Sequence, residues 1–276
     1  MPAPIDEETG STDRAPAEPS RHRVGEQQLL DRLWDFADPE ASAERFRGLA
    51  DDESETAHTR AVVQTQLARA LGLLGRGDEA LAVLDRVAAL PVAVDEPAAF
   101  AAELRARVAI ERGRLAATDG RPADAVPELT RGVREAAIAG STFLVLDALH
   151  MLALNDVGHE EEWATEGFDV LDGTRDPRLR RWGVALHNNL GWTLHDSGRL
   201  TGALMQFEEA ARAAEAYGTA QQRHVAKWSV ARCLRSLGRN DEALELQRAL
   251  AAERPDDPYV QAELAALTEA PPTIEA

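Results

Sequence analysis

The sequence is poor in cysteine, in aromatic residues and in long apolar runs. Its single cysteine, Cys233, excludes an internal disulfide and a cysteine metal cluster, and is typical of a reducing compartment. Aromatic residues make up 5% of the chain and valine-rich alternating runs are missing, so the sequence contains few of the residues and patterns that favour β-strands. No stretch has the length and apolarity of a membrane span or a secretory leader, which predicts a cytoplasmic protein.

Basic residues are also scarce relative to acidic ones. Lysine and arginine total 30 against 48 aspartates and glutamates, which gives a formal charge of −18. A molecule with this charge repels a phosphate backbone, so we do not expect general nucleic-acid binding.

Motifs that carry catalysis are missing as well. The sequence has neither a glycine-rich phosphate loop nor a G-x-S-x-G nucleophile turn. The stretch HEEEW at 159–163 has Trp163 where a zinc-protease helix needs its second histidine. His187 and His195 are two helical turns apart, too far for one metal. We therefore expect no catalytic residue, no metal site and no cofactor, and we predict that the protein is not an enzyme.

What the chain has in abundance is alanine and leucine, arranged in a repeated pattern. The segments 67–90, 113–133, 190–211 and 230–255 each contain a small residue, a glycine seven positions later and an alanine five beyond it. A glycine there suits the left-handed end of a helix, so each segment predicts a helical hairpin whose small residues mark the closest approach of its helices. These triplets are Ala68, Gly75, Ala80; Gly113, Gly120, Ala125; Gly191, Gly198, Ala203; and Ala231, Gly238, Ala243.

A fifth hairpin fits at 141–173 if its turn is one residue shorter, with Ala153 and Ala164 in the small positions. Its register stays open by one residue. The second small positions, at 80, 125, 164, 203 and 243, then follow one another at intervals of 45, 39, 39 and 40 residues. Repeats of this length stack neighbour on neighbour, because one hairpin alone cannot bury its apolar face.

Over residues 58–255 the chain resembles the tetratricopeptide repeat family, in a long-repeat form of about 40 residues. The residues that carry the resemblance are Leu190, Gly191, Ala203, Phe207 and Ala210, with Pro255 twelve positions after Ala243. The resemblance implies an all-α, right-handed superhelical solenoid of antiparallel helical hairpins. Because the usual repeat has about 34 residues and HEAT-type repeats have about 40–47, the HEAT type remains the alternative.

The regions outside the repeats suit the ends of such an array. Asp38 and Pro39 predict the N-cap and first residue of a helix, and Asp-Pro recurs before 258–267. The expected division is a disordered tail at 1–24, a capping helical pair at 25–57, about five repeats at 58–255, a capping helix at 256–267 and a disordered tail at 268–276.

The first helix of each hairpin has two distinct faces. At 100° per residue, Leu186, Leu190 and Leu194 share one face of their helix. The resemblance to the tetratricopeptide repeat family implies that this face packs and that the opposite face of each first helix lines a concave groove. The predicted groove residues are Arg69, Arg107, Arg114, His150, Asn188, Asn189, Trp192, His195, Trp228, Arg232 and Arg235.

Charge and aromatic content single out this predicted groove. Five arginines against Glu111 and Asp147 give it a positive balance within an acidic chain. Trp192 and Trp228 are either binding residues or packing residues between neighbouring hairpins, and the sequence leaves both interpretations open.

These observations predict a non-enzymatic scaffold that binds a peptide or protein segment, possibly acidic, in its concave groove. The alternative is a regulatory sensor module that binds a small ligand or a signalling peptide. Some relatives in the family grip a terminal carboxylate with lysine and asparagine, but the matching positions here hold Asn188, Asn189 and Trp192 without the lysine. The partner, the pathway and the oligomeric state are not set by the sequence.

Overall fold

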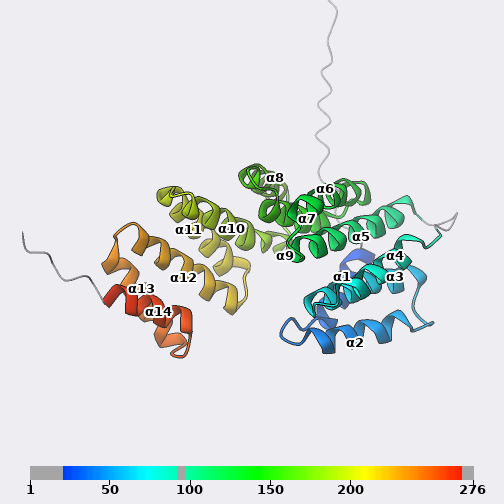
Figure 1. Ribbon diagram of the computed structural model, residues 1–276, viewed down its shortest axis with the longest axis horizontal. Helices are drawn as coiled ribbons and strands as arrows, with labels where there is room; N and C mark the ends of the chain where they lie inside the picture. Colours follow the sequence, from blue (N-terminus) through cyan, green and yellow to red (C-terminus); the bar gives the residue numbers. More distant parts are fainter. Residues whose placement is uncertain (1–20, 92–96, 269–276) are drawn as a thin grey trace, which may run out of the picture.

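The computed structural model describes residues 21–91 and 97–268, and every regular element in those ranges is a helix (Figure 1). The predicted all-α solenoid is confirmed. In chain order the helices are α1 (Arg21–Leu33), α2 (Pro39–Ala50), α3 (Ala57–Leu73), α4 (Gly77–Ala88), α5 (Ala98–Thr118), α6 (Pro122–Ala139), α7 (Thr142–Asn155), α8 (Glu160–Asp172), α9 (Pro177–Arg180), α10 (Trp182–Asp196), α11 (Leu200–Tyr217), α12 (Ala220–Ser236), α13 (Asn240–Glu253) and α14 (Pro258–Thr268).

Five antiparallel hairpins build an arched row. Their pairs are α3 with α4, α5 with α6, α7 with α8, α10 with α11, and α12 with α13, and each first helix also contacts the first helix of the next hairpin. Figure 1 shows α6 and α8 along the outer edge of the arch, with α7, α9 and α10 toward its inner side. The single-turn helix α9 was not expected from the sequence. It is capped by Asp176, whose carboxylate accepts the backbone N–H of Arg178 at 2.9 Å.

The glycines in the middle of the hairpins end the first helices as predicted. Gly75, Gly120, Gly198 and Gly238 have φ between 72° and 77°, a left-handed conformation that glycine adopts without strain. At Gly198, the backbone N–H of Arg199 reaches back to the carbonyl of Leu194 at 2.9 Å, which closes the end of α10. The turn between α7 and α8 uses Gly158, with φ of 93°.

The small residues mark close helix contacts, as predicted, and a Cβ added to Gly113 would also lie 3.2 Å from the backbone oxygen of Ala125. A Cβ added to Gly191 would lie 2.5 Å from Cε1 of Phe207, so the glycine makes room for an aromatic ring of the second helix rather than for Ala203. At Gly113 the neighbour is Leu129, whose Cγ would lie 2.6 Å away. In both hairpins, the side chain that occupies the space beside the glycine belongs to the residue four positions after the second small residue: Phe207 after Ala203, and Leu129 after Ala125.

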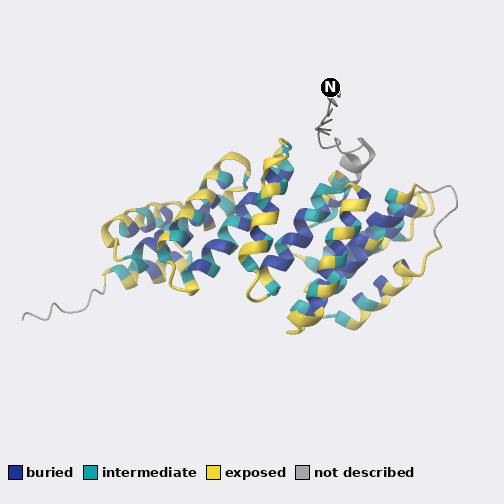
Figure 2. Ribbon diagram, turned by 90° about the horizontal axis from the view of Figure 1, so that it is seen from above, coloured by how far each residue is buried: buried dark blue, intermediate teal, exposed yellow. Residues whose placement is uncertain are grey.

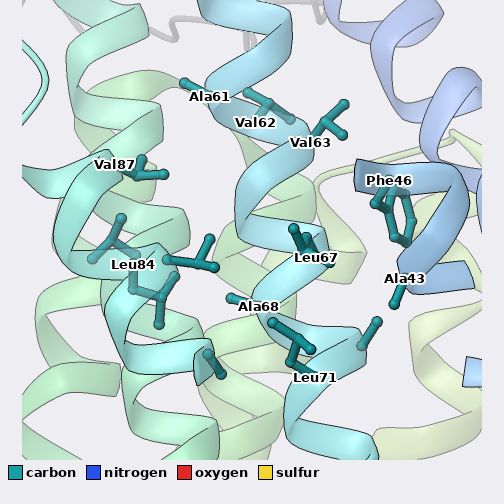
Figure 3. Close-up of a cluster of buried hydrophobic side chains, with 14 of the residues drawn as sticks. Ala43, Phe46, Ala61, Val62, Val63, Leu67, Ala68, Leu71, Leu84 and Val87 are labelled. Carbon is teal, nitrogen blue, oxygen red and sulfur yellow. The ribbon is translucent and has the colours of Figure 1, made fainter. Parts of the chain in front are cut away.

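The N-terminal helices close the end of the core. Figure 3 shows Phe46 of α2 facing Leu67 and Val63 of α3, with Leu84 of α4 on the other side of α3. Phe46 and Leu84 are fully buried. Figure 2 shows buried residues running through the length of the stack beneath exposed turns, as expected of a solenoid in which each hairpin covers the next.

The boundaries of the terminal elements differ slightly from expectation. Helix α2 begins at Pro39, and the Asp38 carboxylate accepts the backbone N–H of Ala41 at 3.0 Å, as predicted for an N-cap. Helix α1 begins at Arg21, within the segment 1–24 that was predicted to be a tail, and α14 ends at Thr268. The predicted tails otherwise lie outside the described residues. No helix within the described ranges is long and apolar enough to cross a membrane.

Candidate binding surface

The predicted groove residues form one connected surface, which we call the inner face. All lie on the first helices α3, α5, α7, α10 and α12, and polar contacts join neighbouring hairpins. The pair Asn189 and His150 is joined at 3.2 Å, and the Ser229 hydroxyl donates to the Asn188 side-chain oxygen at 2.9 Å. Next along the row, Nε2 of His195 lies 2.9 Å from the Ser236 hydroxyl. These contacts bring predicted groove residues of neighbouring first helices together.

The middle of the inner face is a buried ion cluster. Arg114 of α5 donates to Glu111 at 3.1 Å and to both carboxylate oxygens of Asp147 at 2.9 and 3.0 Å. Burial alone would raise the pKa of Asp147, but the guanidiniums of Arg114 and Arg69 hold that pKa below its ordinary value. Arg114 therefore links α5 to α7 and is paired with two carboxylates, those of Glu111 and Asp147.

Arg107 is less available than predicted. Its side chain is 6% exposed, and its guanidinium donates to Glu103 on the same helix at 2.8 and 3.0 Å. A charge pair that is this well buried is already satisfied locally. Arg107 borders a cavity of the inner face, but it is a structural residue of α5 rather than a free cation.

Arg69 has a different environment. Its guanidinium carbon lies 5.7 Å from the ring centroid of Trp34 and 5.6 Å from that of Phe36, distances typical of cation–π contacts. Among the described residues, none forms an ion pair with Arg69. The aromatic pair follows α1, one of the two capping helices predicted over 25–57, and lines the same cavity as Arg69. Sequence reasoning missed its contact with Arg69 because the groove was predicted from the first helices of the repeats alone.

At the other end of the inner face, two arginines share one carboxylate. Arg232 and Arg235 of α12 approach the oxygens of Glu263 on α14 at 3.1 and 2.7 Å. Glu263 is 6% exposed, so this cluster also anchors the last helix. The sequence interpretation missed Glu263 because α14 lies outside the repeat pattern.

An aromatic row runs beside these arginines. Trp192 contacts Phe207 of its own hairpin at 4.9 Å between ring centroids and Trp228 of the next hairpin at 5.8 Å. Trp228 in turn meets Tyr259 edge-on at 6.0 Å, and Tyr259 is 70% exposed. Both tryptophans are partly buried, so they pack between hairpins while keeping some surface on the inner face.

The expected positive balance of this face needs correction. The sequence count set five arginines against Glu111 and Asp147, but the structure adds Glu103 and Glu263 as partners. Five arginines then face four carboxylates, and the charge is uneven. Arg114 has two carboxylates, Arg232 and Arg235 share one, and Arg69 has none among the described residues. Positive charge is therefore in excess only at the two ends of the face.

The described residues hold no cluster of histidine, cysteine, aspartate and glutamate that suits a metal ion. Cys233 is buried against the α10–α11 hairpin, and burial raises the pKa of its thiol, which keeps it protonated and unreactive. The groups that this surface presents are aromatic rings, guanidiniums and amides.

No protein-family model and no curated protein matches the sequence. Among solved structures, the chain is similar to a crystal structure of nearly identical TPR-like repeats assigned to a kinesin light chain of Podosopora anserina. Identity is 20%, the TM-score is 0.52, and the match covers 77% of this chain and 98% of that one. A single-substitution variant of those repeats matches at 19% identity with a TM-score of 0.50, covering 78% and 100%. At this identity the likeness shows the fold alone: the chain folds as a stack of tetratricopeptide-like repeats, as its residue pattern predicted.

Proposed function

We propose that this protein is a non-enzymatic scaffold that binds a segment of a protein partner along the C-terminal half of its inner face. The observation that carries the proposal is the row of Trp192, Trp228 and Tyr259 beside two arginines that share one carboxylate. Tryptophan, tyrosine and arginine are the residues that most often dominate binding energy at protein interfaces. Extended concave surfaces of helical solenoids are suited to this kind of recognition.

Local charge favours an acidic segment. Glu263 neutralises one of the two guanidiniums, so Arg232 and Arg235 together keep a surplus positive charge. A carboxylate of the partner supplies the missing charge through charge-assisted hydrogen bonds, which are stronger than neutral ones. The ion cluster around Arg114 has the opposite balance, so acidic side chains are expected at α12 and α14 rather than at α5 and α7.

The experiment starts from the full chain purified from its native host together with any stoichiometric partner. That partner is then titrated against Arg232→Ala, Trp192→Ala and the control Arg121→Ala, a half-exposed arginine in the turn before α6. We expect Arg232→Ala to weaken binding about tenfold and to reduce its salt dependence, since it removes one charged contact. Trp192→Ala is expected to weaken binding without changing the salt dependence, and Arg121→Ala to change neither.

The melting temperature of each variant separates binding from folding. Unchanged affinity in both the arginine and the tryptophan variants would place the partner elsewhere on the molecule. A large drop in melting temperature for Trp192→Ala would assign that side chain to packing between hairpins.

A further inference from the structure

A separate cavity lies at the N-terminal end of the inner face. Its volume is about 400 Å³, within the range of about 300–1,000 Å³ that is typical of small-molecule sites. Helix α1 and the residues after it form one wall, helices α3, α5 and α7 form the floor, and the start of α10 closes the far end. The row of aromatic residues proposed above for the protein partner is on α10, α12 and α14, so the two sites are distinct.

Aromatic rings line two sides of this cavity. Trp34 and Phe36 stack in parallel, with ring centroids 4.6 Å apart and 3° between the planes. Toward α10, Phe143 and Trp182 meet edge-on at 5.6 Å. Flat apolar walls of this kind accept a planar ring, because aromatic groups prefer stacked and edge-on contacts.

Most polar side chains that line the cavity have partners among the described residues, whereas the guanidiniums of Arg69 and the exposed Arg181 form no hydrogen bond or ion pair there. Gln66 accepts the indole N–H of Trp34 at 2.9 Å, and the carboxylates of Glu111 and Asp147 are held by Arg114. Arg69 meets only the faces of Trp34 and Phe36 among its described partners. A guanidinium presents five donors in a flat fork, and within residues 21–91 and 97–268 no carboxylate pairs with the fork of Arg69.

We propose that this cavity binds a small aromatic carboxylate, with the carboxylate on the guanidinium of Arg69 and the ring between the aromatic walls. Arg181, exposed at the rim of the cavity, adds a second positive charge on the approach. Burial, followed by the charge of Arg114, lowers the pKa of Arg69, and the more distant carboxylates of Glu111 and Asp147 offset this only in part. The proposal is independent of the protein-binding function and supports a ligand-sensing role for the same chain.

The test uses three naphthalene probes of similar size and different charge: 2-naphthoate, 2-naphthamide and 2-naphthylmethylammonium. Each is titrated into the full chain by calorimetry. We expect saturable binding of one naphthoate, with the neutral amide about tenfold weaker because it loses the charge-assisted contact with Arg69. The cation is expected not to bind. Preference for the cation would mean that Glu111 and Asp147 control the cavity, and would overturn the proposal.

Two variants assign the effect to Arg69. Arg69→Gln is expected to weaken naphthoate binding at least about tenfold, and Arg69→Lys to give an intermediate affinity because it keeps the charge and loses the fork. The matched control is Arg76→Gln, a partly exposed arginine in the α3–α4 turn that pairs with Glu79. Melting temperatures of all variants report whether the fold is intact.

The proposal fails if naphthoate shows no saturable binding at millimolar concentration, or if Arg69→Gln and Arg76→Gln bind it equally. Titration of the protein partner against Arg69→Gln keeps the two sites apart. Its affinity is expected to be unchanged, whereas loss of partner binding with retained naphthoate binding would contradict the assignment of separate sites.

Discussion

At the scale of single residues, Gly191 sets the distance between two helices. The ring of Phe207 occupies the space that a Cβ at position 191 would need, with Cε1 and Cδ1 at 2.5 and 2.6 Å. Phe207 is fully buried and also touches Trp192, so the ring has little freedom to move away. A glycine that is unfavourable for an isolated helix is therefore favourable in this hairpin.

Substitution of Gly191 is expected to be costly. Gly191→Leu should lower the free energy of unfolding by about 2–4 kcal/mol, because overpacking forces the hairpin apart. In the variant Phe207→Leu the penalty should be smaller, since the ring is gone. Gly202→Ala is the control: its Cβ would meet only Leu194 at 3.5 Å, so we expect a small stabilisation in urea unfolding. Equal effects at positions 191 and 202 would contradict the contact with Phe207.

His150 makes the ion cluster sensitive to pH. Burial lowers the pKa of His150 to about 4, Asp147 opposes this, and Arg114 and Arg69 add to it. The unfolded chain takes up the proton near pH 6.5, so the folded state binds fewer protons between pH 6.5 and 4. Stability is therefore fully present above pH 6.5 and falls as the pH drops toward 4.

The expected loss across this window is about 1–3 kcal/mol, given about 1.4 kcal/mol per pKa unit. His150→Gln should flatten the dependence, as measured by urea unfolding between pH 4.5 and 7.5. Burial also lowers the pKa of His187, so a smaller slope should remain. At pH 7.5 the difference between the two proteins gives the packing effect of the substitution alone. Parallel curves for both proteins would show that His150 does not titrate in this range.

At the scale of elements, side-chain caps start the helices α2, α3, α9 and α12. Helix α12, which carries Trp228, Arg232 and Arg235, begins with a capping box. The Thr219 hydroxyl accepts the backbone N–H of Gln222 at 3.2 Å, and the Gln222 side chain accepts the backbone N–H of Thr219 at 3.0 Å. Two backbone donors that a helix start leaves unpaired are thereby satisfied.

Removal of this cap should destabilise the protein measurably. Thr219→Ala is expected to lower the free energy of unfolding by about 1 kcal/mol. Gln222→Ala should cost less in the Thr219→Ala background than in the unmodified protein, because the two side chains form one capping box. The matched control is Thr118→Ala at the exposed end of α5, where we expect a change within about 0.5 kcal/mol. Urea unfolding monitored by tryptophan fluorescence gives both values, and similar losses at both positions would exclude a specific capping effect.

At the scale of the whole molecule, stability is distributed along a line. Each hairpin contacts only its neighbours, so α1 and α14 are covered on fewer sides than α5, α6 and α10. Glu263 links α14 to α12 through two arginines, whereas the indole of Trp34 ties the end of α1 to Gln66. The two binding surfaces proposed above therefore include the terminal helices, which have the least support.

Hydrogen exchange tests this gradient. We expect amides of α5, α6 and α10 to exchange slowest and those of α1 and α14 fastest, because local opening is easiest where neighbours are fewest. Glu263→Gln should speed exchange in α14 more than in α5, since it weakens the ion cluster that holds the last helix. Uniform protection along the chain would contradict a solenoid in which hairpins open from the ends.

The sequence by itself determined the helical hairpins and the row in which they stack. Small residues at fixed intervals and glycines at helix ends are local signals, and local signals repeat whenever the repeat does. Even Glu103 was within reach of sequence reasoning, because Arg107 follows it by four positions on one helix. The extra helix α9 was missed because one helical turn carries too short a pattern.

Only the tertiary structure decided which charges remain free. Glu263 reaches Arg235 across 28 residues, and Trp34 reaches Gln66 across 32, through helices that the repeat pattern does not describe. These contacts depend on how each hairpin is rotated against the next and on how the terminal helices dock. That rotation follows from the packing of whole side chains between hairpins, which residue spacing within one helix does not encode.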